Sequence, residues 1–172
     1  MENTNRNFFY ARLGIVISVI GCGLLSLFVS FGNITDYWTN FEFVKHVLSM
    51  DTIFPNSNVK YRSIENSSLH HTFYISIITS EVIISYFILR GSIKMIINIK
   101  KEPSNFQEAK KDSFIGLALG IALWFIGFEV IGGEWFSMWQ SSIWNGLNSA
   151  NRIVIFYAIT YILMLVPENN NF

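Results

Sequence analysis

Four long apolar stretches alternate along the chain with shorter segments in which polar and charged residues gather. The apolar stretches cover residues 13–31, 72–99, 114–131 and 143–166. Each is close to the length of about 20 residues that an α-helix needs to cross roughly 30 Å of hydrocarbon. Backbone polar groups inside a bilayer must be satisfied within the segment, so each stretch is predicted to be a transmembrane helix. The predicted fold is therefore all-α: an antiparallel four-helix transmembrane bundle that forms a single domain.

The composition supports lipid as the solvent of this chain. Of its 172 residues, 51% are hydrophobic and only 14% are charged, whereas soluble domains average about 25% charged residues. The formal net charge is zero, which gives no indication of a nucleic-acid partner. The single cysteine, Cys22, has no partner in the chain for a disulfide bond.

The basic residues predict the orientation of the bundle. Arg6 and Arg12 precede the first stretch, and the long loop at 32–71 contains only Lys45, Lys60 and Arg62. Short loops rich in lysine and arginine stay in the cytoplasm. We therefore expect both termini to be cytoplasmic, with loops 32–71 and 132–142 on the outer side. The basic residues near the short connection between the second and third stretches are Arg90, Lys94, Lys100, Lys101, Lys110 and Lys111.

Small residues recur at helical spacing in two of the stretches. Those in the third stretch are Gly116 and Gly120, and such spacing lets helix backbones approach closely. The stripes indicate packing within the bundle, with a seam between copies in a homo-oligomer as the alternative. Residues 19–22 also resemble a lipoprotein cleavage box, but the chain stays apolar beyond it, which favours an uncleaved helix. The small residues of the first stretch are Gly14, Ser18, Cys22, Ser26 and Ser30.

The two predicted outer loops are expected to form a structured extracytoplasmic cap. In residues 36–50, apolar side chains fall on one helical face, which predicts an amphipathic helix lying in the membrane interface. In the second loop, Gly132 and Gly133 are expected to end the third helix, and Gln140, Ser141 and Ser142 to cap the fourth. The candidate recognition residues on this face are Glu134, Trp135, Trp139, Gln140, Trp144 and Asn145.

All three histidines, His46, His70 and His71, fall on the predicted outer side, with Met50 and Asp51 close to the first. Histidine, methionine and aspartate together are able to bind a transition metal, and histidine is able to ligate a haem. The spacing matches no established metal motif. Hydrogen bonding of the histidines to loop backbone is therefore the favoured interpretation, with a metal or haem site as the alternative.

Three charged residues, Glu81, Glu129 and Arg152, fall inside predicted spans, where charges are costly unless they are paired or hydrated. Counting along the helices places Glu81 and Arg152 near mid-membrane, which predicts a buried ion pair between the second and fourth helices. With Glu129 they outline either a polar path for protons, ions or a ligand, or a polar contact that fixes helix register. The structural interpretation is favoured.

Several strings in the predicted outer segments carry a family resemblance: FVKHVLSMDT at 43–52, LHH at 69–71, GEWFSMWQS at 133–141 and WNG at 144–146. They resemble the bacterial "predicted small integral membrane protein" family, and the likeness covers nearly the whole chain. The sequence KYR at 60–62 departs from the tryptophan expected beside the arginine, which bears on local packing only. The resemblance implies a bacterial inner-membrane protein with four helices. It implies no activity and no catalytic residues.

The residues themselves favour a non-enzymatic role, because no nucleophile lies beside a base in any recognisable motif. Aromatic and polar groups gathered on one face are typical recognition anchors. We expect an accessory or partner-binding subunit of a bacterial inner-membrane complex, surrounded by lipid and a membrane-protein partner or a second copy. The alternatives are an outer-face metal or haem protein, and a small oligomeric transporter or channel. The latter lacks the internal repeat that transporters usually show.

Overall fold

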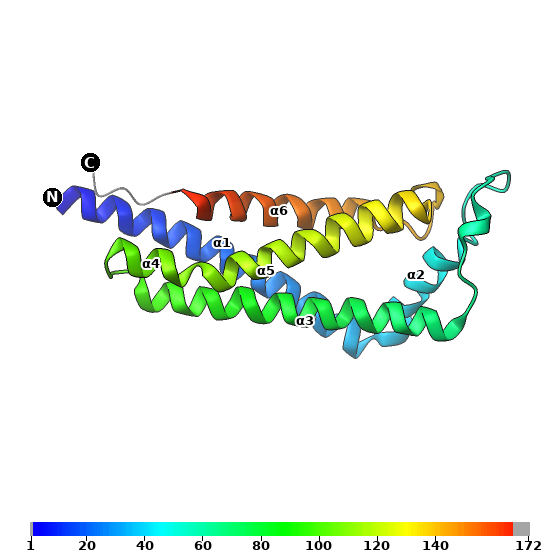
Figure 1. Ribbon diagram of the computed structural model, residues 1–172, viewed down its shortest axis with the longest axis horizontal. Helices are drawn as coiled ribbons and strands as arrows, with labels where there is room; N and C mark the ends of the chain where they lie inside the picture. The colour runs from blue at the N-terminus through cyan, green and yellow to red at the C-terminus, as the bar shows by residue number, and fades with distance from the viewer. Residues whose placement is uncertain (1, 167–172) are drawn as a thin grey trace.

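The structure is a computed structural model that describes residues 2–166, with side chains from residue 8 onward. Every regular element in this range is a helix. Four helical segments are long and apolar enough to cross a membrane: Phe8–Thr35, Ser67–Asn98, Pro103–Trp135 and Leu147–Leu165. They run antiparallel, so that α1 begins and α6 ends at the same end of the bundle (Figure 1). The predicted all-α four-helix bundle is confirmed.

The first three membrane-spanning helices begin before their apolar stretches, whereas the fourth is shorter than the apolar stretch at 143–166. They are α1 (Glu2–Thr35), α3 (Ser67–Asn98), α5 (Lys111–Ile121), which continues directly into the π-helix η2 (Ala122–Trp135), and α6 (Leu147–Leu165). Hydrophobicity marks only the part of a helix that lies in hydrocarbon, whereas the backbone keeps its hydrogen bonds on into the polar regions. We call the end of the bundle with α2 the cap end, and the opposite end the terminal end.

The glycine pair does not end the third helix, contrary to the prediction. Gly132 and Gly133 are buried inside η2, and the chain turns only at Ser137, which has a positive φ of 55°. A Cβ atom at Gly133 would lie 2.9 Å from a methyl carbon of Leu147. The second glycine therefore serves close packing against the start of α6 rather than a break in the helix.

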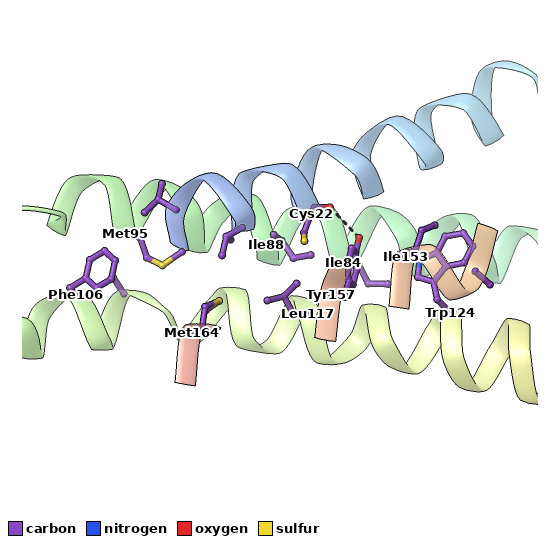
Figure 2. Close-up of a cluster of buried hydrophobic side chains, with 14 residues drawn as sticks. Cys22, Ile84, Ile88, Met95, Phe106, Leu117, Trp124, Ile153, Tyr157 and Met164 are labelled. Carbon is purple, nitrogen blue, oxygen red and sulfur yellow. Dashed lines mark hydrogen bonds between the residues drawn. The ribbon is translucent and has the colours of Figure 1, made fainter. Parts of the chain in front are cut away.

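The centre of the bundle is marked by Tyr157, which is fully buried in α6. Its hydroxyl donates a hydrogen bond to the carbonyl oxygen of Cys22 in α1 at 3.1 Å, the dashed line in Figure 2. Its ring lies where a side chain at Gly120 of the third helix would be, and Ile84 of α3 packs into the same cluster. Each of these residues is near the middle of its span, so together they mark the level of the membrane midplane.

The small-residue stripes pack inside the bundle. Gly116 faces the backbone of α3, and Gly120 faces Tyr157 of α6. In α1, Ser26 and Ser30 are buried, whereas Gly14 meets no other side chain within 4 Å. Packing within the chain therefore explains the small residues of the third span, and those of α1 that lie nearest the cap end.

Cys22 lies inside an unbroken helix. Its side chain is buried and its sulfur lies 3.3 Å from the hydroxyl of Thr160 in α6. The thiol is therefore part of the contact between α1 and α6.

The cap contains α2 (Tyr37–Ser49), η1 (Lys60–Arg62) and η3 (Met138–Gln140). The predicted amphipathic helix is present as α2, and its buried face includes Phe41, Val44 and Leu48. The two loops are joined by hydrogen bonds: the hydroxyl of Thr52 donates to that of Ser141 at 2.8 Å, and the backbone N–H of Phe54 donates to Gln140 at 3.1 Å.

The residues expected to cap α6 lie before it. The hydroxyl of Ser141 accepts backbone N–H groups of Ile143 and Trp144 and so closes a turn. α6 itself begins at Leu147, whose N–H donates to the side chain of Asn145 at 3.1 Å. Gln140 is engaged by the first loop instead.

The terminal end is closed by α4 (Pro103–Ala109), a short helix that the apolar pattern did not predict. Arg12 is buried there and donates from one nitrogen to the carbonyl oxygens of Ile99 at 2.8 Å and Lys101 at 2.7 Å. Lys110, also buried, donates to the carbonyl oxygen of Met164 at 3.1 Å. Cations at these positions satisfy carbonyl groups that the ends of α3 and α6 leave without helical partners.

Candidate functional site

The three histidines are dispersed over the cap, each with its own partner. One ring nitrogen of His46 lies 2.6 Å from Asp51, and the other lies 3.3 Å from Glu42. His70 is buried and its ring nitrogen lies 2.7 Å from the carbonyl oxygen of Ile64.

His71 is held by aromatic groups. Its ring nitrogen lies 2.7 Å from the hydroxyl of Tyr37, and its ring stacks on Phe41 with centroids 4.1 Å apart. His46 likewise stacks on Trp144 at 4.6 Å. These contacts give the histidines a role in joining α2, α3 and the second loop.

The structure does not assemble the hypothesised metal site from His46, His70, His71 and Asp51. Among residues 8–166, whose side chains the structure describes, no three histidine, cysteine, aspartate or glutamate side chains converge as metal ligands. Met50 is buried and ends α2 in the left-handed conformation, with φ of 50°. Glu42, the carboxylate beside His46, also accepts a hydrogen bond from Lys45, and this hydrogen bond lowers the pKa of Glu42.

Glu81 is the most unusual polar group of the bundle, because its side chain is completely buried within a membrane span. One carboxylate oxygen accepts a hydrogen bond from the side chain of Asn33 at 2.8 Å, and the other has no hydrogen-bond partner. The hydroxyl of Tyr74 donates to the backbone carbonyl of the same Asn33 at 3.0 Å. Glu81 thus lies at the inner end of a short line of polar groups that begins at the cap.

The predicted ion pair between Glu81 and Arg152 is not formed. Ala150, Ile153 and Tyr157 occupy the inward face of α6, which turns Arg152 outward, where it is exposed. Successive helical residues point about 100° apart, so similar depth in the membrane does not bring two side chains together.

Glu129 is half-buried in η2, and one of its oxygens has no hydrogen-bond partner. Among the described residues no hydrogen bond or ion pair joins Glu129 to Glu81, so the two carboxylates do not form a continuous polar path.

The outward face of α6 is polar at a depth where lipid chains are expected. An open hollow there is lined by Asn148, Asn151, Arg152, Ile155 and Phe156. Arg152 precedes the midplane residue Tyr157 by five residues, about 7.5 Å at the helical rise. Since the half-thickness of the hydrocarbon is about 15 Å, its backbone lies well inside the apolar region.

The candidate recognition residues of the cap separate into two groups. Glu134, Trp135 and Trp139 are exposed, and the guanidinium of Arg62 lies 4.8 Å from the ring centre of Trp135. Gln140 and Trp144 join the two loops through the contacts described above, whereas Asn145 is exposed and accepts the backbone N–H of Leu147 at the start of α6.

Residues 11–167 match the family described as "Predicted small integral membrane protein". The chain belongs to this family. The match covers most of the chain, so the resemblance carried by the cap strings is confirmed and the four apolar helices are those of an integral membrane protein. The family has no established function. No curated protein and no solved structure shows significant similarity.

For this small integral membrane protein, one candidate surface was missed by the sequence analysis. Asn148, Asn151 and Arg152 are spaced by three and four residues, so they share one face of a helix. That spacing is visible in the sequence, but the predicted ion pair with Glu81 placed Arg152 inside the bundle, so the two asparagines beside it were not considered.

Proposed function

We propose that the protein is an accessory subunit that binds a different membrane protein through the outward face of α6. The observation that carries the proposal is the exposed Arg152, with Asn148 and Asn151 beside it, at hydrocarbon depth. A charged residue at the centre of a lipid-facing helix costs about 2.5–3.5 kcal/mol on insertion scales, and Arg152, about 7.5 Å from the midplane, bears part of that cost. A partner helix that presents a carboxylate would offset that cost.

The chemistry of the face defines the partner. Arg152 calls for an aspartate or glutamate in the partner's transmembrane segment, because a guanidinium forms paired hydrogen bonds with a carboxylate. Asn148 and Asn151 provide further donors and acceptors, and the exposed Ile155 and Phe156 provide apolar contact area. Polar side chains between transmembrane helices contribute about 0.6–2 kcal/mol each.

We also propose the bacterial inner membrane as the location, with both termini in the cytoplasm. Eight of the twelve lysine and arginine residues lie toward the terminal end, whereas the cap loops carry Lys45, Lys60 and Arg62; the eight are Arg6, Arg12, Arg90, Lys94, Lys100, Lys101, Lys110 and Lys111. Short basic segments favour the cytoplasmic side.

Site-specific photo-cross-linking in the native membrane tests the partner. A photoreactive phenylalanine analogue in place of Ile155 should give one defined protein adduct, and mass spectrometry should map it to a transmembrane segment with an acidic residue. Arg152→Leu should reduce this adduct about tenfold, since an isolated carboxylate is left in the interface. Thiol labelling in the same cells tests the orientation of the bundle. A cysteine at Asn56 in the cap should react with a membrane-impermeant thiol reagent added outside.

The matched control places the photoreactive residue at Ile83, which is exposed on α3 near the same depth. It should give no protein adduct. An adduct with a second copy of this chain would replace the accessory-subunit proposal with a homo-oligomer. Cross-links to lipid alone from both positions would show that Arg152 reaches phosphate groups instead of a partner.

A second candidate, a small oligomeric ion or proton path, is favoured by the unpartnered oxygen of Glu81. If Glu81 moves protons, Glu81→Gln should abolish pH-driven flux in proteoliposomes, because the amide takes up no proton in this range. Glu65→Gln, an exposed position in the cap, is the control. Equal flux in the wild type, both variants and empty vesicles would remove this candidate.

A further inference from the structure

A pocket opens between α3 and the third span in the cap half of the bundle. α5 packs closely on α3, but η2 diverges from α3 and packs on α6 (Figure 1). The amphipathic helix α2 covers the resulting wedge from the cap side, through Val44, Val47 and Leu48. The pocket has a volume of about 160 Å³.

The wall of the pocket contains no charged side chain and no side chain with an N–H, O–H or carbonyl group. Every lining residue is Phe, Leu, Ile, Val, Met or Gly. Water in such a space would find no partners, and apolar cavities of about 150 Å³ stay dry and bind small hydrocarbons such as benzene. The pocket is therefore suited to hydrocarbon and excludes a charged or strongly polar ligand.

The pocket faces the bilayer sideways. Its innermost wall includes Phe136 and Met138, which are 6% and 2% exposed, whereas Phe73 and Ile131 at its mouth are 45% and 46% exposed. Ile77 lies seven residues from the midplane residue Ile84, which corresponds to about 10 Å. That depth is inside the hydrocarbon of one leaflet, whose half-thickness is about 15 Å, whereas Phe73, eleven residues from Ile84 and about 16 Å from the midplane, lies at the boundary with the headgroups.

We infer that this pocket binds one acyl chain of a phospholipid from the leaflet on the cap side. The chain enters between Phe73 and Ile131, and α2 lies above it at the level of the headgroups. A segment of a flexible hydrocarbon chain suits the volume, the apolar wall and the lateral opening, and the rest of the chain stays in the bilayer. The inference does not depend on the proposed partner, which contacts the outward face of α6.

A larger side chain at Gly127 would fill the pocket. This glycine lies in the wall, and a Cβ atom there would meet only the side chain of Leu123, at an ordinary contact distance of 3.7 Å. Gly127→Leu should therefore occupy the pocket without forcing the backbone to move. Gly21→Leu on α1 is the matched control, because a Cβ atom at this exposed glycine meets nothing within 4 Å.

The full-length protein is reconstituted in phosphatidylethanolamine–phosphatidylglycerol vesicles with a trace of phosphatidylcholine that carries a diazirine in its acyl chain. After irradiation, peptide mapping should find adducts concentrated in residues 43–48 and 123–138. Gly127→Leu should reduce these adducts about tenfold, since a filled site leaves no volume for the chain. Gly21→Leu should leave them unchanged.

Even labelling of all lipid-facing helices, or labelling of 43–48 and 123–138 that survives Gly127→Leu, would overturn the inference. Displacement of the adducts by a small excess of free fatty acid would identify a different source for the chain and overturn the phospholipid assignment. Each variant is first checked for a wild-type elution profile in detergent. If Gly127→Leu fails this check, Val47→Phe fills the same pocket from α2 and replaces it, with the same expected loss.

Discussion

Gly116→Ala is expected to destabilise the protein by about 2–3 kcal/mol, near the upper end for overpacking a well-packed site. A Cβ atom at Gly116 would lie 2.8 Å from the backbone nitrogen of Ile88 and 3.1 Å from the carbonyl oxygen of Ile84. These are backbone atoms of α3, which have no rotamer to adopt, so the two helices must separate. The same crossing is also close at Gly91 of α3, where a Cβ atom would lie 2.5 Å from the backbone nitrogen of Ser113 in α5.

Thermal unfolding in a mild detergent measures this effect. The control is Gly14→Ala in α1, where a Cβ atom meets nothing within 4 Å. Alanine has the higher helix propensity, so this control should be neutral or stabilising by up to about 1 kcal/mol. Similar melting temperatures for the two variants would contradict the close crossing of α3 and α5.

Arg12→Met is expected to cost about 3 kcal/mol and to loosen the terminal end of the bundle. The guanidinium donates to the carbonyl oxygens of Ile99 and Lys101, and hydrogen bonds to charged groups contribute about 1.5–3 kcal/mol each. It also lies 4.8 Å from the ring centre of Phe106 in α4. Methionine retains most of the volume but leaves the end of α3 without this donor.

Arg90→Met is the matched control, because it makes the same chemical change at a half-exposed site. Arg90 lies 3.3 Å from Asp112, which Lys94 also contacts at 2.6 Å. Lys94 still pairs with Asp112 when Arg90 is replaced, so this variant should melt close to the wild type. Hydrogen–deuterium exchange should show faster exchange at 95–110 in Arg12→Met only; equal protection in both variants would argue against the role of Arg12.

Local composition was sufficient to predict much of this architecture. Four apolar stretches in lipid have few alternatives to four helices, because unsatisfied backbone groups are excluded from hydrocarbon. The 3.6-residue period likewise identified α2 and its buried Phe41 and Leu48. Family membership was visible in the strings that form the cap.

The helix ends were less predictable. Gly132 and Gly133 are compatible with both a break and a close contact, and only the position of Leu147 against η2 decided for the contact. Similarly, Ser141 caps a turn rather than α6, because the first loop and the second loop pack together. Such choices depend on neighbours that are distant in the sequence.

By itself, the sequence determined that this is a four-helix integral membrane protein, because the hydrophobicity and length of each stretch are sufficient to identify a membrane-spanning helix. Only the tertiary structure decided what each intramembrane polar group faces. Depth along a helix can be counted, but rotation about its axis is set by packing: Tyr157 turns inward and so directs Arg152 to the surface, while Glu81 meets Asn33. Arg12, counted in the sequence as a loop charge, is buried for the same reason, since the ends of α3 and α4 close over it.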